Sequence, residues 1–451
     1  MEHADTLEPP VKRGLVERLL SPFADVREGE AASALLLTLL MFLVLSAYYM
    51  LKTAREVFIL SEGGAEVKSY ASAGQALLLL AIVPAYSAFA SRVNRAQLIS
   101  WIPLFFISNI LLFMLASRAG LGIGVPYFLW VGIFNVMVIA QFWAFANDIY
   151  TKEQGRRLFP LIGVGSSLGA WTGSVRAGNL MASSGPLRLL IGAAVILVIC
   201  VILARIVDRT SRRATPSQAA TAEEPLGEGP SGFTMLIQDR YLALIALLTI
   251  LLNVVNTGGE YLFGRYIVQN AIDLYGAGDA SQLERGRYIG EAYSSFYGSV
   301  NLLGLLLQLF VVSRVFKWLG VGRALFIHPL IAGIGYVLML RAPSFEALRF
   351  LKIWDNATDY SLSNTTRQAL WLPTSRQAKY KAKQAVDSFC MRAGDVLQAG
   401  IVFVGERAAF GTPTFAVINL ALTAGWLATA GALSRRLHDA PSAPAATARS
   451  A

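Results

Sequence analysis

Residues Phe350–Asp387 read FLKIWDNATDYSLSNTTRQALWLPTSRQAKYKAKQAVD. The sequence around this segment is strongly apolar, yet polar and charged side chains recur in its first half, where a membrane span is expected. They are Lys352, Asp355, Asn356, Asp359, Asn364 and Arg367. One charge at the centre of a spanning helix costs roughly 2.5–3.5 kcal/mol on insertion scales. Several in one helix must face protein or water, so we expect this segment to line a polar cavity.

The composition predicts an all-α polytopic membrane protein. Of 451 residues, 55% are hydrophobic and 15% are charged, whereas a soluble domain carries about 25% charged residues. Apolar runs long enough to cross about 30 Å of hydrocarbon recur along the chain. A transmembrane β-barrel would instead show alternating segments of about 10 residues. The net charge of +10 does not indicate nucleic-acid binding, because the basic residues cluster in short loops between the apolar runs.

We expect about twelve spans, separated into two groups of six by a linker. The spans cover roughly 31–53, 69–90, 98–118, 124–147, 158–181, 187–207, 241–263, 292–313, 322–341, 346–371, 384–405 and 412–433. The linker is predicted from the Pro, Gly, Ser and Glu content of ATPSQAATAEEPLGEGPSG. The expected parts are a cytoplasmic segment 1–30, a bundle 31–207, the linker 208–240, a bundle 241–433 and a disordered cytoplasmic tail 434–451.

Short matches between the two groups of spans indicate a duplication. Ser91–Val93 resembles Ser313–Val315, and Tyr150–Arg156 resembles Pro373–Lys379, at offsets of 222 and 223 residues. Both pairs occupy equivalent places in the predicted topology. A six-plus-six duplication is the plan of major-facilitator transporters, whose substrate site lies near the membrane midplane between the halves. An ion channel would usually carry a filter loop, and the sequence shows none.

Lysine and arginine concentrate in one set of loops. These loops include Arg92, Arg95, Lys152, Arg156, Arg157, Arg314, Lys317, Arg376, Lys379, Lys381 and Lys383. The positive-inside rule places this set, together with both termini, in the cytoplasm.

Charges in spans one and seven are candidates for substrate binding, and among them Lys52 and Glu56 are candidates for gating or coupling. Span one contains Lys52, Arg55 and Glu56, and span seven contains Glu260 and Arg265. Arg55 and Arg265 occupy about the same place in the two halves, and a guanidinium offers a planar fork for phosphate or carboxylate. We expect the two arginines to clamp an anion, with Glu260 pairing one of them in the empty site. Alternatively, the span-one charges lie at the membrane edge, where basic side chains snorkel to water.

Span ten carries the densest polar pattern. Asp355, Asp359, Ser363 and Arg367 recur every four residues, which places them on one helical face. Asn364 belongs to a neighbouring polar stripe. The alternative is a structural polar network between the halves.

Two further pairs are candidates for gating or coupling. Lys383 and Asp387 enter span eleven, although Lys383 could equally be one of the cytoplasmic topology determinants. Asn147 and Asp148 end span four, beside aromatics that could stack on a planar ring or simply anchor the helix at the membrane interface.

Other motifs favour structural roles. Gly165, Gly169 and Gly173 predict close helix packing, because no strand precedes them and no Gly-Lys-Ser/Thr follows, as a phosphate-binding loop requires. Cys200 and Cys390 lie in apolar runs and are expected to pack there. His3, His328 and His438 are scattered. We find no motif for a metal, a cofactor or an enzyme.

Three segments together resemble the ATP/ADP translocases of plastids and obligate intracellular bacteria. They are LKTAREVFIL at 51–60, FWAFANDIYTKEQGRRLFPLIGVGSSLGA at 142–170 and DYSLSNTTRQALWLPTSRQAKYKAKQAVD at 359–387. The resemblance implies a twelve-span, major-facilitator-like bundle. It also implies exchange of a nucleoside triphosphate for a diphosphate, although some members import nucleotides with protons or carry other cofactors.

The resemblance also implies site residues. The family's basic residue in span one falls on Arg55, its acidic residue in span seven falls on Glu260, and its basic residues after span ten fall on Arg367, Lys381 and Lys383. One position departs from the pattern. The plastid proteins carry a glutamate on the outer half of span four, where this chain has Val131. This departure leaves open a different phosphorylated or anionic metabolite.

We therefore predict a monomeric nucleotide antiporter in the bacterial inner membrane that works by alternating access, embedded in the lipid bilayer and without nucleic-acid partners. Arg55, Arg265 and Arg367 would receive phosphates, while the span-seven and span-ten carboxylates would balance charge in the empty site or bind ribose and base. One rival is a proton-coupled carrier in which Glu260, Asp359 or Asp387 cycles a proton. Another is a membrane scaffold or sensor that transports nothing.

Overall fold

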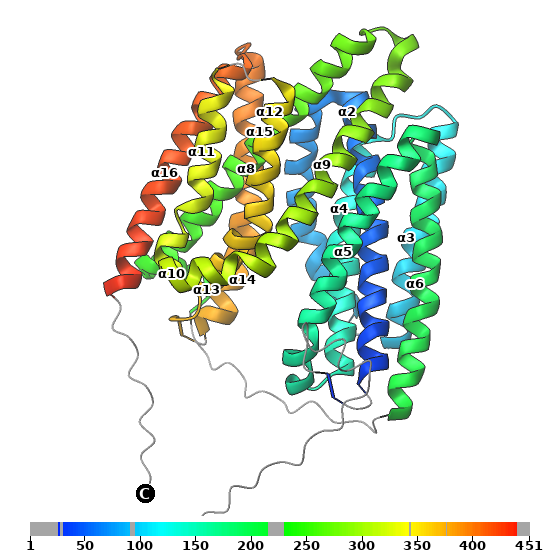
Figure 1. Cartoon of the computed structure of the whole chain (residues 1–451), viewed down its shortest axis with the longest axis vertical. Coiled ribbons are helices and arrows are strands. Elements are labelled where there is room, and N and C mark those ends of the chain that lie inside the picture. Colours follow the sequence, from blue (N-terminus) through cyan, green and yellow to red (C-terminus); the bar gives the residue numbers. More distant parts are fainter. Residues whose placement is uncertain are drawn as a thin grey trace, which may run out of the picture. The chain divides into compact units, whose positions relative to one another are not determined.

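The computed structural model describes residues 26–27, 30–90, 95–214, 230–341, 344–375 and 377–439. Helices dominate these ranges and no strand occurs in them (Figure 1), which agrees with the predicted all-α fold class. The predicted cytoplasmic segment and tail, and the basic residues Arg92 and Arg376, lie largely or wholly outside the described residues.

Five helices make up the described part of the first sequence half. They are α2 (Ala31–Ala90), α3 (Arg95–Arg118), α4 (Gly124–Ile149), α5 (Lys152–Ser184) and α6 (Pro186–Ala214). Helix α2 contains two of the expected spans, because its path breaks at Gly64, whose φ of 68° lies in the left-handed region that glycine tolerates. The expected loop between these spans is helical apart from this break, so Arg55 and Glu56 lie within a helix and not at its end.

The second half has more and shorter elements. They are α7 (Gly232–Gln238), α8 (Arg240–Tyr275), η1 (Asp279–Ser281), α9 (Gln282–Phe310), α10 (Val312–Ala324), α11 (Ile327–Met339), α12 (Phe345–Thr358), η2 (Asp359–Ser363), α13 (Asn364–Ala369), η3 (Ala378–Ala382), α14 (Lys383–Ala385), η4 (Val386–Cys390), α15 (Met391–Arg407) and α16 (Thr412–Asp439). Elements η2, η3 and η4 are single π-helical turns. Such turns are rare and often occur at functional sites.

Each expected span overlaps a helix in the described ranges. Within them, seven helices are long and apolar enough to cross a membrane alone, or eight if α9 and α10, bent by 74°, form one broken span. The polytopic membrane class is therefore supported, and the count of twelve stays a prediction.

Helical structure narrows the expected linker and tail. Helix α6 continues to Ala214 and α7 begins at Gly232, so helix occupies both ends of the predicted linker, while 215–229 lie outside the described residues. Helix α16 continues to Asp439, so the predicted tail began too early. In α6 and α16 the apolar pattern ends before the helix does. The part of a helix that extends beyond the hydrocarbon does not need apolar residues.

The chain forms two compact units whose borders differ from those of the sequence halves. Unit one comprises Met1–Ala54, Tyr86–Leu121 and Phe134–Thr221, and unit two comprises Arg55–Ala85, Gly122–Ile133 and Ala222–Ala451. The predicted loop after the first span and most of the second predicted span, up to Ala85, therefore belong with the second-half helices. This grouping was not expected from the sequence.

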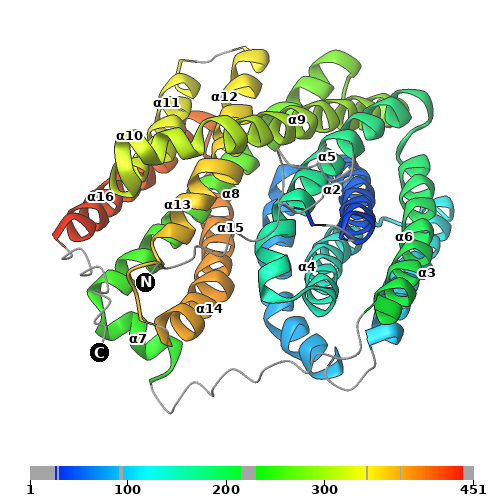
Figure 2. The same ribbon diagram turned by 60° about the horizontal axis from the view of Figure 1, so that its bottom comes forward.

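Small residues bring helices together in unit one. A Cβ added to any of three α5 glycines would overlap the backbone of α2. The pairs are Gly165 with Thr38, Gly169 with Phe42 and Gly173 with Ser46. The Ser46 hydroxyl also donates to the Gly169 carbonyl at 3.1 Å. The predicted packing role of these glycines is confirmed. Helices α3 and α6 lie side by side in the same unit (Figure 2).

A buried carboxylate joins α2 to α5 near one end of unit one. Arg157 donates to both Glu30 oxygens, at 2.9 and 2.8 Å, and Gln154 adds a bond of 3.1 Å. Burial alone would raise the pKa of Glu30, but the bonds from Arg157, the Arg27 backbone N–H and Gln154 lower that pKa to about 2. Thr151 and Gln154 form a reciprocal capping box that fixes the start of α5.

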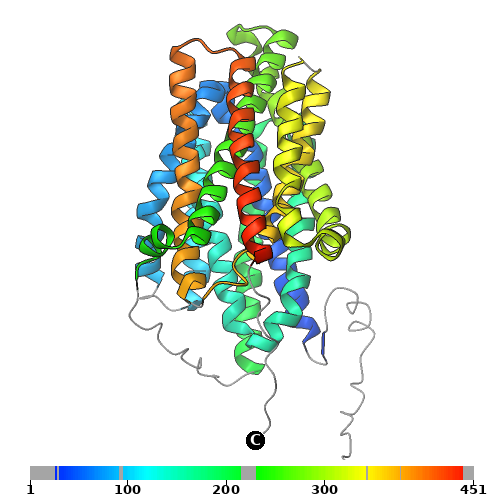
Figure 3. The same cartoon turned by 90° about the vertical axis from the view of Figure 1, so that its left-hand side faces the viewer.

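Helix α8 is the central element of unit two. It packs against α9, α12, α15 and α16. Helix α16 packs against α11 as well as α8, and Figure 3 shows α16 alongside α11. Elements α12, η2 and α13 follow one another without a break from Phe345 to Ala369, with the π-helical turn in the middle. The polar first half of the segment identified in the sequence is therefore helical as far as Ala369, and it packs inside a bundle.

Replacing Gly169 with alanine should lower the free energy of unfolding by about 1–3 kcal/mol, because the new methyl group meets α2 backbone that cannot rotate away. Thermal melting in detergent measures the effect. Gly163→Ala is the matched control, since that position of α5 has open space beside it. Equal melting temperatures for the two variants would contradict the packing described above.

Replacing Glu30 with glutamine should destabilise the protein at neutral pH and have little effect near pH 2. A pKa lowered by folding gives stability that is present above the unfolded value of 4.5 and lost as the pH falls toward 2. Melting temperatures of both proteins across this range provide the test. A difference that does not shrink with acidification would contradict the role of the ionised carboxylate.

Candidate functional site

Buried and partly buried charges of unit two form one chain of alternating sign. In order, its members are Arg55, Glu56, Lys68, Glu260, Lys352, Asp355, His328, Asp359 and Arg367, with successive nitrogen–oxygen distances of 2.5, 2.7, 3.9, 3.9, 2.8, 3.1, 3.9 and 3.5 Å. Four cations face four carboxylates, so the chain is electrically neutral when His328 is neutral. We refer to it as the ion chain.

The first part of the ion chain ties α2 to α9. The Glu56 side chain is fully buried and contacts Arg55 at 2.5 Å and Lys68 at 2.7 Å. The Tyr297 hydroxyl of α9 donates to the same carboxylate at 3.1 Å, and Lys68 donates to Tyr293 at 3.2 Å. These charges are buried among helices, so the alternative that the span-one charges snorkel at the membrane edge was wrong for Arg55 and Glu56.

Lys352 occupies the middle of the ion chain. Its side chain is 3% exposed, and its ammonium contacts Asp355 at 2.8 Å, Asn256 at 3.2 Å and Glu260 at 3.9 Å. Gly259 provides the space: a Cβ at that position would lie 2.8 Å from the Lys352 ammonium. The helix–helix contact and the buried charge therefore depend on the same glycine.

Glu260 has partners that differ from the predicted ones. Two ammonium groups, those of Lys68 and Lys352, flank it at 3.9 Å, and Asn356 donates to it at 2.8 Å. The prediction that Glu260 pairs with Arg55 or Arg265 was wrong. One of these lysines belongs to span ten and the other to α2, and neither could be placed beside Glu260 from the sequence.

Arg265 belongs to a separate cluster. It contacts Glu406 of α15 at 2.8 Å and the Tyr261 hydroxyl at 2.9 Å, and Tyr261 also donates to Glu406. Its side chain is 33% exposed, against 13% for Arg55. The expected two-arginine clamp is therefore replaced by two separate ion pairs.

His328 joins the two carboxylates of span ten. Its Nε2 lies 3.1 Å from Asp355 Oδ1, its Nδ1 lies 3.9 Å from Asp359 Oδ1, and its ring packs edge-on against Trp426 of α16. The four-residue spacing placed Asp355 and Asp359 on one face, and both do face His328. No pattern in the sequence distinguishes this histidine from the other two.

Arg367 closes the ion chain from α13. Its guanidinium lies 3.5 Å from Asp359 Oδ1 and 3.7 Å from the Met391 sulfur. The π-helical turn η2 begins at Asp359 and ends before Arg367, and it changes the helical register between these two residues. Ser363 is buried in this turn, and the next residue, Asn364, is exposed.

The remaining predicted site residues are not members of the ion chain. Lys383 and Asp387 form their own exposed pair at 2.8 Å. Asn147 and Asp148 are exposed near the end of α4 in unit one. Lys52 also belongs to unit one, where it is buried with its ammonium 5.3 Å from the centre of the Tyr49 ring.

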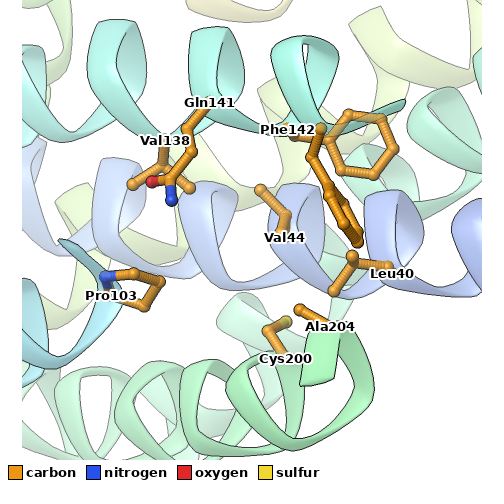
Figure 4. A pocket seen from close by; sticks show the side chains of 9 residues that line it. Leu40, Val44, Pro103, Val138, Gln141, Phe142, Cys200 and Ala204 are labelled. Carbon is orange, nitrogen blue, oxygen red and sulfur yellow. The ribbon is translucent and has the colours of Figure 1, made fainter. Parts of the chain in front are cut away.

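A small cavity in unit one lies among α2, α3, α4 and α6 (Figure 4). Its lining residues are Leu40, Val44, Pro103, Val138, Gln141, Phe142, Phe145, Cys200 and Ala204. At about 40 Å³ it has little more than the ~30 Å³ that one water occupies in the liquid. It is therefore too small for a metabolite. Cys200 packs in its wall, and Cys390 is likewise buried and free, as predicted.

The fold resembles that of solved transporters. The crystal structure of the nucleoside transporter NupG aligns with a TM-score of 0.61 and 12% identity, covering 88% of this chain and 98% of that one. A bacterial homologue of the human lysosomal transporter Spinster aligns with a TM-score of 0.59 and 14% identity, covering 93% and 100%. These similarities support the major-facilitator-like fold. No protein-family model matches the chain.

The chain is similar in sequence to curated ADP,ATP carrier proteins. ADP,ATP carrier protein 1 of Chlamydia muridarum is 26% identical over 349 residues, covering 67% of this chain and 62% of that protein. ADP,ATP carrier protein 2 of Arabidopsis thaliana chloroplasts is 23% identical, covering 67% and 53%. This chain is a sequence relative of the ADP,ATP carrier proteins. The predicted resemblance is confirmed, although this chain spans less than two thirds of the length of these relatives.

Replacing Lys352 with methionine should lower the free energy of unfolding by about 3–5 kcal/mol, because Asp355 loses its lysine partner and Glu260 loses one of its two. The double variant Lys352→Met/Asp355→Asn should lose less, since both charges of one pair are removed. Denaturant titration of the purified protein measures both effects.

The matched control is Lys383→Met, which removes the lysine of an exposed pair and should change stability by less than about 1 kcal/mol. If Lys352→Met were as mild as Lys383→Met, the ion chain would not depend on its central ammonium.

Proposed function

We propose that this protein is a membrane antiporter that exchanges adenine nucleotides, ATP against ADP, by alternating access. The observation that carries the proposal is the neutral, buried ion chain in a transporter fold whose sequence relatives are named ADP,ATP carrier proteins. Buried charges are rare in spanning helices and mark substrate or ion pathways. A purely structural network would need no such concentration of charge in one bundle.

The cations of the ion chain suit a polyphosphate. Arg55 and Arg367 offer guanidinium forks, and Lys68 and Lys352 offer point charges. Each cation already contacts a carboxylate oxygen, and a phosphate oxygen can replace that oxygen in the same hydrogen-bonding position. We assign phosphate recognition to these four residues, which replaces the predicted assignment of Arg265. Asn256, Asn356 and Glu260 would then be free to bind ribose hydroxyls or the base.

Exchange follows from the charge balance. A nucleotide brings three or four negative charges, which displace Asp355, Asp359 and Glu260 from their cations. When it leaves, the carboxylates return and the ion chain closes on itself. The segment Arg55–Ala85 takes part through Lys68, which contacts both Glu56 and Glu260. We infer that the empty ion chain holds this segment against α8 and α9, and that bound phosphate loosens it, so that loaded protein changes conformation faster than empty protein.

The proposal also covers the membrane location, the topology and the oligomeric state of the protein. We propose that it lies in the bacterial inner membrane, with both termini in the cytoplasm and twelve spans in two six-helix halves joined by the linker, and that it works as a monomer. Arg156, Lys379 and Lys381 would face the cytoplasm under the positive-inside rule. Lys383 and Asp387, together with Asn147 and Asp148, would lie at that surface as gating residues.

A second candidate is a proton-coupled carrier of another anionic or phosphorylated metabolite. Val131 favours it, because the plastid translocases carry a glutamate at the corresponding place. Glu260 or Asp359 would then cycle a proton. Such a carrier would follow an imposed pH gradient without any internal nucleotide, whereas an exchanger requires one.

Proteoliposomes loaded with ADP should take up labelled ATP at least about tenfold faster than empty ones, because only loaded protein reorients. Arg367→Gln should reduce this exchange by about tenfold or more, through the loss of one charged phosphate contact. Arg435→Gln, at the exposed end of α16, is the matched control and should exchange normally. No uptake of any nucleotide with any internal counter-substrate would overturn the proposal.

A further inference from the structure

We propose that His328 is the proton-binding site of this transporter, and that its proton neutralises the extra negative charge of the more highly charged nucleotide. The inference rests on the proposed exchange of nucleotides. ATP and ADP differ by one negative charge when fully ionised. Histidine is the residue type that proteins use to bind and release protons, and His328 is the one histidine of the ion chain.

The geometry defines the neutral form of His328. Its Nε2 lies 3.1 Å from Asp355 Oδ1. At this distance a lone pair on the nitrogen would repel a lone pair on the oxygen. Nε2 therefore carries the hydrogen and donates it to Asp355. Nδ1 is then left with a lone pair 3.9 Å from Asp359 Oδ1, and it is buried without a hydrogen-bond partner. A proton added at Nδ1 converts this repulsive contact into an ion pair.

The surroundings of His328 offer that proton no competing destination. Helix α12 contributes Asp355, which also binds Lys352, and η2 contributes Asp359. Helix α16 contributes the Trp426 ring, and its titratable residues, Arg435, Arg436, His438 and Asp439, all lie in its last turns. Within α11 itself, His328 and Tyr336 are the titratable residues, and Tyr336 donates its hydrogen to the Val255 carbonyl.

Protonation would change what Arg367 can bind. Arg367 and His328 approach the same atom, Asp359 Oδ1, at 3.5 and 3.9 Å. An imidazolium draws that oxygen toward itself and leaves the guanidinium available to a phosphate. The ion chain also passes from neutral to a net charge of +1, which favours an anion. Because linkage is reciprocal, bound anion must equally favour the proton on His328.

The three histidines of the chain make this coupling directly observable. Protein labelled with 13C at histidine Cε1 is titrated by NMR between pH 5 and 9, alone, with ADP and with ATP. The signal that disappears in His328→Gln belongs to His328, and His438→Gln identifies the second. We expect ADP to raise the pH midpoint of His328 by about one unit, equivalent to about tenfold tighter binding to the protonated protein. ATP should raise it further, and the His438 midpoint should stay fixed.

Exchange measurements separate this proposal from the proposed function. His328→Gln keeps a donor toward Asp355 but cannot take up a proton, so it should exchange ADP for ATP with a rate that no longer varies with pH, while His438→Gln keeps the normal pH profile. Working exchange with an unmoved His328 midpoint would overturn the proton site and leave the function intact. No exchange, but a midpoint raised by inorganic pyrophosphate, would overturn the function and leave the proton site intact. A midpoint that no anion moves overturns the proposal even if the glutamine variant fails to fold.

Discussion

A buried ammonium keeps its charge only when carboxylates surround it, and the rest of unit two is arranged around this requirement of Lys352. The contact with Glu260 connects α12 to α8, the contact with Asp355 lies within α12, and Gly259 gives the side chain its space. A charge taken from water without a partner would cost several kcal/mol. The carboxylates need cations in turn, so the pairing extends outward until it reaches Arg55 at one end and Arg367 at the other.

This extension has a mechanical consequence. Lys68 lies in the first sequence half and Glu260 in the second, yet they belong to one compact unit. Glycines make the contact close, since Gly264 of α8 faces Leu60 and Ala65 and Gly286 of α9 faces Val57 and Ser61. The segment Arg55–Ala85 is thus held by the same charges that an anionic substrate would compete for. Ligand binding and release of this segment are therefore alternative uses of one set of cations.

The sequence was sufficient for the fold class and for part of the site. Apolar length gave the helices, and the glycine spacing in α5 gave their contact with α2, because both depend on local pattern alone. It also selected Arg55, Glu260, Asp355, Asp359 and Arg367, whose charge is anomalous in a span. It missed Lys68, because the sequence placed that residue in a loop, whereas the structure continues as helix beyond the break at Gly64. It also missed His328, which is a single histidine in an apolar run. The partners of Glu260 and Arg265 depend on which helices adjoin, and a single sequence carries no record of that.

The central claim is that the ion chain is an anion site whose carboxylates stand in for phosphate. A cryo-electron microscopy structure with bound ADP tests it most directly. The account predicts phosphate oxygens within hydrogen-bonding distance of Lys352 and Arg367, with Asp355 and Asp359 moved out of contact with these two cations. An ADP molecule bound elsewhere, with the contacts of 2.8 Å between Lys352 and Asp355 and 3.5 Å between Arg367 and Asp359 intact, would contradict it.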